Sequence, residues 1–344
     1  MITARRPRHA LLIAALVCAT ALSTGAASAG EVNIYLTREP GLIEPLLKVF
    51  TEKTGIAVNT LFLKDGMAER VAAEGANSPA DMLMAVDIGN LVDLTEKGVT
   101  QPIRSEVLEA AIPANLRDVD GNWFALSLRA RVLYTARELE LESINYEDLA
   151  DPRWKGHLCI RSGQHPYNTA LFAAYLAKHG EAATEEWLNG LKANLARRSG
   201  GGDRDVARDI LGEICDIGPA NSYYVGLMRS GAGGPEQEQW GAAIDVVLPT
   251  FVDGGTHVNI SGAAIARNAP NKAAAIKLLE FLVSDEGQKL YADANYEYPV
   301  KAGVAPNDII AALGRLDVDP LSLDEIAKYR KAASELVDKT GFDN

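Results

Sequence analysis

Apolar and polar residues recur with two different periods along the first third of the chain. Short apolar runs typical of buried strands are separated by stretches in which apolar residues return every three or four positions, as on one face of a helix. Gly55 and Gly98 end two of these helical stretches. This alternation of strands and helices predicts parallel strand pairing with right-handed crossovers. The predicted strands are 32–36, 56–63 and 81–86, and the predicted helices are 42–54, 67–73 and 90–96.

The strand pattern restarts near Arg129 and continues with a second group of elements. Two α/β units in one chain are typical of a binding protein whose two lobes close on a ligand about a hinge. Each lobe then has a mostly parallel sheet flanked by helices, and the ligand binds at the carboxyl ends of the strands. The predicted strands of the second part are 132–135, 157–161, 215–219, 244–248 and 258–266, and the predicted helices are 169–178, 183–195, 205–213, 271–293 and 322–338.

Composition narrows the class of protein. The 344 residues are 47% apolar and 23% charged, which is typical of a globular protein. The formal net charge of −12 argues against nucleic acid as a partner, because a phosphate backbone requires a basic surface. No apolar run reaches the 18 residues that a membrane-spanning helix needs, so we expect the mature protein to have none.

Residues 1–29 have the pattern of a secretory signal peptide. Arg5, Arg6 and Arg8 precede an apolar stretch, and Ala27-Ser28-Ala29 supplies the small residues of a cleavage site. The alternative, a membrane anchor, would need a longer apolar stretch. The pattern therefore predicts cleavage near Ala29 and an acidic exported protein.

Two cysteines remain after removal of the signal segment, Cys159 and Cys215. Disulfides form in exported proteins, so we expect these two residues to be bridged. The bridge would close a loop of about 57 residues and contribute about 4 kcal/mol in the chain-entropy model. Two buried free thiols are the alternative.

Catalytic signatures are scarce in this sequence. It contains no G-x-S-x-G, H-E-x-x-H or P-loop motif and no G-x-G-x-x-G after a strand, and its histidines show no metal-ligand spacing. We therefore expect a binding protein rather than an enzyme.

Three tyrosines lie where the cleft is expected: Tyr167, Tyr223 and Tyr224 follow predicted strands. A phenolate oxygen is a hard anionic donor suited to a hard cation such as Fe³⁺. A free phenol ionises near pH 10, so at neutral pH it needs a bound cation to stabilise the charge. The alternative is that these residues are half-buried aromatics whose hydroxyls line the crevice wall. The residue types by themselves leave both interpretations open.

Several short segments occur in a characteristic order along the chain: 32–35 (VNIY), 51–56 (TEKTGI), 78–81 (SPAD), 128–132 (LRARV), 154–156 (WKG), 220–224 (ANSYY), 261–264 (SGAA) and 296–299 (YEYP). In these segments the chain resembles the periplasmic ferric-ion-binding proteins of ABC transporters. The resemblance covers essentially the whole mature chain. It implies a two-lobed periplasmic-binding-protein fold with residues 30–128 plus 254–299 in lobe 1 and residues 129–253 plus 300–344 in lobe 2.

The resemblance also implies a set of metal ligands. Tyr223 and Tyr224 match the paired tyrosine ligands of the family, and Tyr167 matches the third tyrosine of the branch that uses three or more phenolates. Other branches use a histidine in the first loop and a glutamate after the third strand. This chain has Glu39 near the first of these positions and Val86 near the second, so Glu39 is a candidate fourth ligand. Water or carbonate would fill the remaining positions.

Charged side chains near these loops are candidates for supporting roles. Arg38, Arg129 and Arg131 would hold an anion such as carbonate or offset phenolate charge, because a guanidinium fork suits a planar anion. Pairing with acidic residues of the chain is the alternative for each arginine. Asp87 would cap the third helix and orient the site from outside. His165 would donate a hydrogen bond near Tyr167, or else remain a solvated loop residue.

The family resemblance implies a monomer that delivers Fe³⁺ to an inner-membrane ABC permease. Two other classes stay open at this point. The first is the same fold with another solute, such as thiamine, a polyamine or a phosphonate, which would be bound by aromatic boxes or anion clamps. The second is an exported enzyme on an α/β scaffold.

Overall fold

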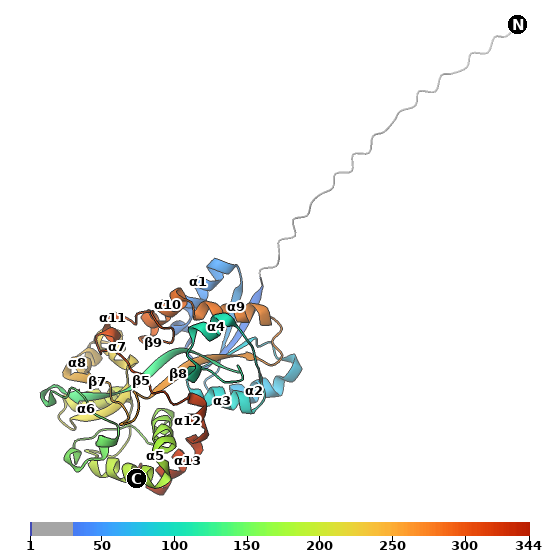
Figure 1. Cartoon of the computed structure of the whole chain (residues 1–344). Helices are drawn as coiled ribbons and strands as arrows, with labels where there is room; N and C mark the ends of the chain where they lie inside the picture. Colours follow the sequence, from blue (N-terminus) through green and yellow to red (C-terminus); the bar gives the residue numbers. More distant parts are fainter. Residues whose placement is uncertain (2–29) are drawn as a thin grey trace.

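The computed structural model describes Met1 and residues 30–344, so the predicted signal segment lies outside the described residues. The chain forms an α/β structure in which helices flank an open sheet with the strand order β2-β1-β3-β8-β5-β6 (Figure 1). The predicted α/β class is confirmed. Among the described residues, no helix has the length and apolar character needed to cross a membrane.

The first part of the chain forms the predicted parallel unit. The central strand β1 pairs in parallel with β2 on one side and with β3 on the other. Pro45 lies in the first turn of α1, where its missing N–H costs no hydrogen bond. The bounds are β1 Glu31–Leu36, α1 Glu44–Thr54, β2 Ala57–Phe62, α2 Met67–Glu74, β3 Met82–Ala85, α3 Ile88–Glu96, β4 Thr100–Gln101 and α4 Glu106–Ala111.

Two long antiparallel strands, β5 (Phe124–Ala136) and β8 (Val258–Ala266), connect the two halves of the sheet. The first half of β5 pairs with β8, and its second half pairs with β6 and β7. The sequence predicted only 132–135 of β5, because Arg129 and Arg131 interrupt the apolar pattern. Both arginines are buried in the strand, where their Nη atoms donate to oxygen acceptors elsewhere in the chain.

The second part of the chain departs from prediction in its strand pairing and in its elements. Strand β5 pairs antiparallel with β6 and β7, although a mostly parallel sheet was predicted, and the helices Tyr223–Arg229 and Pro235–Ala243 were not predicted. The predicted strand 157–161 is wrong, because only Leu158 forms isolated bridges, one to Leu195 and one to Ile217. The predicted helices 169–178 and 183–195 are continuous except at Gly180, whose φ of 78° breaks the helical geometry. The bounds are α5 Pro166–Asn194, α6 Asp203–Leu211, β6 Ile217–Asn221, α7 Tyr223–Arg229, α8 Pro235–Ala243 and β7 Ile244–Val247.

The C-terminal part is divided more finely than the sequence predicted. The amphipathic stretch 271–293 is two helices, because Ser284 starts a new helix by accepting a hydrogen bond from the N–H of Gly287. The stretch 322–338 divides at Tyr329. The bounds are α9 Lys272–Leu282, α10 Asp285–Asn295, β9 Tyr298–Pro299, α11 Asp308–Ala311, α12 Leu323–Lys328 and α13 Arg330–Lys339.

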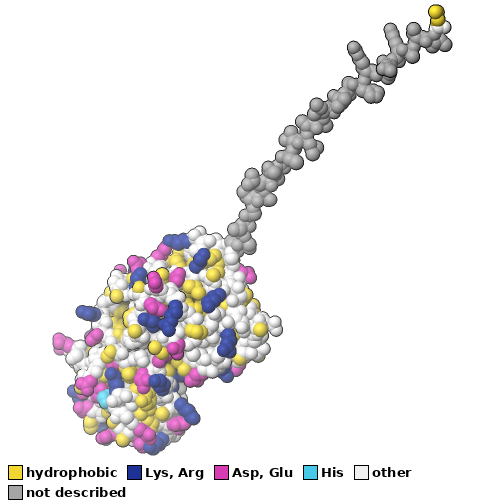
Figure 2. Space-filling view, turned by 45° about the vertical axis from the view of Figure 1, so that its right-hand side comes forward, with side chains coloured by type: hydrophobic (Ala, Val, Ile, Leu, Met, Phe, Trp, Pro, Cys, Tyr) yellow, Lys and Arg dark blue, Asp and Glu magenta, His cyan; other side chains and the backbone are white. Residues whose placement is uncertain are grey.

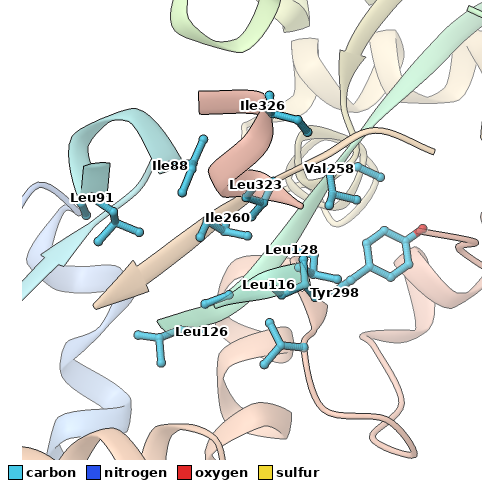
Figure 3. Packing of buried hydrophobic residues seen from close by; sticks show 14 of the residues in the cluster. Ile88, Leu91, Leu116, Leu126, Leu128, Val258, Ile260, Tyr298, Leu323 and Ile326 are labelled. Atoms are coloured by element: carbon cyan, nitrogen blue, oxygen red, sulfur yellow. The ribbon is translucent and has the colours of Figure 1, made fainter. Parts of the chain in front are cut away.

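The hydrophobic core extends along the paired strands β5 and β8, which run between the two halves of the molecule. Figure 3 shows Leu126 and Leu128 of β5 near Val258 and Ile260 of β8, with Tyr298 of β9 beside them. All five are buried. The crossing strands therefore carry a packed core from one half of the molecule to the other. On the outside, acidic and basic side chains are interspersed over the face shown in Figure 2.

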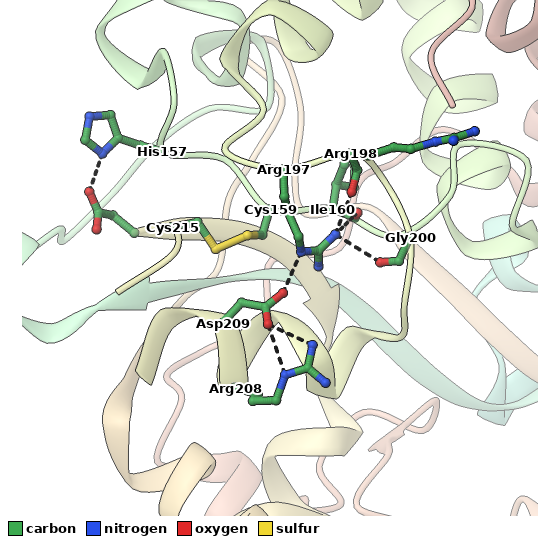
Figure 4. The surroundings of a disulfide bond; sticks show 10 residues. His157, Cys159, Ile160, Arg197, Arg198, Gly200, Arg208, Asp209 and Cys215 are labelled. Carbon is green, nitrogen blue, oxygen red and sulfur yellow. Dashed lines mark hydrogen bonds and ion pairs between the residues drawn. A yellow bond between two sulfur atoms is a disulfide. The ribbon is translucent and has the colours of Figure 1, made fainter. Parts of the chain in front are cut away.

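The predicted Cys159–Cys215 disulfide is confirmed. The bridge ties the segment before α5 to the start of β6, and both cysteines are buried (Figure 4). Arg197 and Asp209 form an ion pair of 2.6 Å near the bridge.

Mass spectrometry of the exported protein under non-reducing conditions is expected to find neither thiol free. The reason is that the two α-carbons lie 5.8 Å apart, within the range that a disulfide spans. Alkylation of Cys159 and Cys215 before reduction would contradict the bridge. Alkylation only after reduction and unfolding is the expected pattern.

Candidate metal centre

Tyr223 and Tyr224 begin the short helix α7, directly after β6. The turn between them and the strand is fixed by Ser222, whose N–H donates to the carbonyl of Ala130 at 3.0 Å and whose Oγ accepts from the Ala130 N–H at 3.2 Å. The end of β6 is held by Tyr134, whose hydroxyl donates to the carbonyl of Asn221 at 3.0 Å. The two tyrosine rings lie 4.0 Å apart between centroids and are half-buried.

Tyr167 lies in the first turn of α5. Pro166 starts this helix, and His165 caps it by accepting a hydrogen bond from the Tyr167 N–H on Nδ1 at 3.2 Å. The His165 and Tyr167 rings meet edge to face with centroids 4.6 Å apart. Tyr167 is also close enough to Tyr223 and Tyr224 to raise the pKa of both phenols. The fold thus brings the three predicted tyrosines to one place.

The tyrosine pair is protonated when no cation is bound. Burial raises the pKa of Tyr223 well above its ordinary value, and the phenols of Tyr167 and Tyr224 add to this effect. Burial, followed by Tyr167, also raises the pKa of Tyr224. A bound cation would have to displace these protons, so binding and proton release are coupled at this site.

Arginine side chains lie against the tyrosine rings. The guanidinium carbons of Arg129 and Arg161 are 5.4 and 5.2 Å from the centroid of the Tyr167 ring, and that of Arg204 is 5.4 Å from the Tyr224 ring. Positive charge at this distance favours the ionised form of a phenol. Arg129 was a candidate from the sequence, but Arg161 and Arg204 were not, because no motif distinguishes them from solvated arginines.

The guanidinium of Arg129 is fixed by hydrogen bonds to backbone carbonyls. Its Nη2 donates to the carbonyls of Val86 and Ile260. Burial lowers the pKa of the Arg129 guanidinium, but the phenols of Tyr167 and Tyr223 and the carboxylate of Glu297 outweigh burial and leave the pKa raised. Arg129 is therefore a fixed cation beside the tyrosines.

Arg38 is paired with an acid that the sequence did not single out. Its guanidinium contacts Glu297 at 2.6 Å, Ser261 Oγ at 2.6 Å and Asn295 Oδ1 at 2.5 Å, and both Arg38 and Glu297 are buried. Burial raises the pKa of Glu297, but Arg38 and Arg129 outweigh burial and leave it lowered. Glu297 lies in the segment 296–299 that supports the family resemblance, which was the available signal.

Arg131 is occupied by a different acid. Its Nη1 donates to Asp203 at 2.6 Å and to Asn221 Oδ1 at 3.2 Å, and its Nη2 donates to Asn168 Oδ1 at 2.5 Å. Asp203 also accepts from Arg161 at 3.1 Å and from the Asn221 N–H at 2.8 Å. This cluster connects the loops that carry Tyr167 and the tyrosine pair. Arg131 thus has the acidic partner that the alternative interpretation predicted.

The remaining candidates take different positions. Glu39 is exposed before the short 3₁₀ turn Pro40–Leu42, and its carboxylate makes no hydrogen bond or ion pair with other described residues. Asp87 caps α3, as predicted, by accepting from the Gly89 N–H at 2.8 Å. Burial, with Arg161 next, lowers the pKa of His165 to about 4, so His165 is neutral at neutral pH. A neutral imidazole whose Nδ1 accepts from Tyr167 N–H serves as a helix cap here.

The donor set of the site is phenolic. Within residues 30–344, no three His, Cys, Asp or Glu side chains gather into a group that would hold a metal ion. Three phenols with guanidinium groups around them form a site that, once deprotonated, offers three negative charges to a cation. Phenolate oxygens are hard anionic donors, which suit a hard trivalent cation.

The fold and this site together define a two-lobed solute-binding protein. The chain belongs to the bacterial extracellular solute-binding proteins, and residues 77–313 match that family. It is similar to the structure of a Bordetella ferric binding protein, with 65% identity, coverage of 91% of this chain and 100% of that chain, and a TM-score of 0.89.

Two further proteins are similar to this chain over most of its length, at lower sequence identity. The structure of Trichodesmium FutA in complex with iron and citrate ligands is 40% identical, covers 91% of this chain and 100% of that chain, and has a TM-score of 0.86. Iron uptake protein A1 of Synechocystis is 39% identical over 315 residues, which is 91% of this chain and 87% of that protein.

Proposed function

We propose that this protein binds ferric iron through the phenolates of Tyr167, Tyr223 and Tyr224 and delivers it to an inner-membrane ABC permease. The observation that carries the proposal is the meeting of these three phenols beside the Arg129 guanidinium. Three phenolates balance the charge of Fe³⁺. The printed names of the relatives, which refer to ferric binding and iron uptake, support the same cargo.

The protein works as a two-lobed carrier. Residues 30–128 plus 254–299 form one lobe, residues 129–253 plus 300–344 form the other, and the strands β5 and β8 act as the hinge. The signal segment is cleaved near Ala29, and the mature protein acts as a periplasmic monomer without enzymatic activity. Water or carbonate completes the iron coordination.

Loading with ferric citrate is expected to turn the purified protein red through a tyrosinate-to-iron charge-transfer band. The band should fade as the pH falls, because protons compete with iron for the same oxygens and the metal-free phenols have a raised pKa. Dithionite should bleach it, since Fe²⁺ carries one charge less against the same ligands. A protein that stays colourless with ferric citrate and yet binds thiamine, a polyamine or a phosphonate would contradict the proposal.

The same titration decides the role of Glu39. If its carboxylate coordinates iron when the site is filled, Glu39→Gln should move release to higher pH, because an anionic ligand is lost. From its exposed position without partners, we expect the release curves of Glu39→Gln and wild type to coincide. A shift to higher pH would make Glu39 the fourth ligand.

A further inference from the structure

Tyr296 packs against the helix that carries the tyrosine pair. A Cβ built at Gly226 of α7 would lie well inside 3.0 Å of the Cβ and ring carbons of Tyr296, a separation that real Cβ atoms essentially never show. Only glycine therefore allows the Tyr296 ring to lie in its place. The overlapping atoms belong to the base of the Tyr296 side chain, so a rotation of the outer ring would not relieve the overlap.

The conformation of Tyr296 is itself constrained. Tyr296 ends α10 in the left-handed region with φ of 55°, which is uncommon for a residue other than glycine. Its N–H donates to the carbonyl of Ala292 at 2.9 Å. The backbone conformation of Tyr296 therefore fixes the direction of its ring.

The two neighbours of Tyr296 hold Arg38. Asn295 Oδ1 and Glu297 Oε1 both accept from the Arg38 guanidinium, at 2.5 and 2.6 Å. Burial lowers the pKa of the Arg38 guanidinium, but Glu297 and, to a smaller extent, Tyr291 and Tyr223 outweigh burial and leave the pKa raised. Three consecutive residues therefore connect the buried Arg38 cluster to the helix of the tyrosine ligands.

On that helix, Tyr223 and Gly226 are three residues apart and so lie on the same face. Figure 1 shows α7 near β9, which follows directly after Tyr296 and Glu297, on one side of the crossing strands. We infer that Tyr296 and Gly226 are positioning residues, which set the distance between the Arg38–Glu297 pair and the phenols of Tyr223 and Tyr224. This inference rests on the proposed function, because the distance matters for an iron site.

Gly89 gives a comparison, because a Cβ there would meet only the end of a flexible side chain. A Cβ at Gly89 in the first turn of α3 would overlap the guanidinium of Arg330 from α13. That group is the far end of a flexible side chain and can move aside. Gly89→Ala is therefore expected to change the rate of iron release little, in contrast to Gly226→Ala.

The test is a double-mutant cycle on iron release. Gly226→Ala should lose iron to a strong chelator about tenfold faster than wild type, although alanine favours a helix more than glycine does. Removing the whole Tyr296 side chain in Gly226→Ala/Tyr296→Gly should bring the rate back to that of Tyr296→Gly alone, because the overlapping Cβ and ring atoms are gone. The charge-transfer band should keep its wavelength, since all three phenols remain. Gly212→Ala is the matched control, because its Cβ would make only ordinary contacts of 3.5 Å or more.

Spin labels at two exposed positions, Lys48→Cys and Glu236→Cys, provide a readout that needs no iron. The distance between the labels should increase in Gly226→Ala and return in the double variant. A wild-type protein that gives no iron band would contradict the proposed function, while this distance would still test the contact. A Gly226→Ala protein equal to Gly212→Ala in both measurements would overturn the inference, as would an effect that persists without the Tyr296 ring.

Discussion

Replacement of Tyr223 or Tyr224 by phenylalanine is expected to weaken ferric binding by about 100-fold or more, because each change removes an anionic oxygen that we propose as a ligand of the metal. The ring stays, so packing in this half-buried pair with centroids 4.0 Å apart should be almost unchanged. Affinity is measured by competition with a chelator of known strength, and the melting temperature is followed in parallel. The expected result is a large loss of affinity with a small change in melting temperature.

Tyr298→Phe is the matched control for these variants. Tyr298 is buried, and its hydroxyl has no hydrogen-bond partner among the described residues, so its loss should leave iron binding unchanged. Tyr167→Phe should also weaken binding, through the loss of the third phenolate. Undiminished affinity in Tyr223→Phe or Tyr224→Phe would refute the ligand assignment. Retained affinity in Tyr167→Phe alone would leave the pair as ligands and remove Tyr167 from the set.

The second large effect is expected on stability, from Asp203→Asn. The carboxylate of Asp203 is fully buried and accepts from Arg131, Arg161 and the Asn221 N–H. Removing its charge leaves Arg131 buried without an anionic partner, and breaking a buried pair in this way costs about 3–5 kcal/mol. Urea unfolding of the metal-free protein measures the change in the free energy of unfolding.

Asp245→Asn gives the comparison for Asp203→Asn. Asp245 forms an ion pair of 3.4 Å with Arg137, and both side chains are half or more exposed. Exposed pairs contribute about 0–1 kcal/mol, so this variant should unfold nearly as wild type does. Equal losses in the two variants would show that the buried Asp203 cluster contributes no more to stability than an exposed ion pair does.

Much of the fold was predictable because it depends on local patterns. The strands β1 and β3 and the helices α2 and α3 follow apolar periods that hold wherever the segment packs. The predicted boundaries of helices and strands were wrong where a single residue sets the end of an element. Ser284 starts a new helix inside an amphipathic stretch that looks continuous, because its hydroxyl caps a backbone N–H.

The candidate site, like the fold, could be predicted from the sequence only in part. Residue type and position after a predicted strand made Tyr167, Tyr223 and Tyr224 candidates, and the family resemblance then favoured them as metal ligands. They were not enough to say which arginines are free to act on a ligand. Arg38 and Arg131 look alike in sequence to Arg129, but the first two each have a buried carboxylate at 2.6 Å.

The sequence by itself determined the α/β class, the alternating strands and helices of the first part of the chain, the disulfide pair and the candidate tyrosines, since these depend on local pattern or on residue type. Only the tertiary structure decided which charges neutralise one another. Arg38 and Glu297 are 259 positions apart, and Arg131 and Asp203 are 72 apart. The close approach of Tyr296 to Gly226 was likewise absent from any local pattern. Such contacts arise when distant strands and helices pack, and at these separations no short-range periodicity specifies the partner.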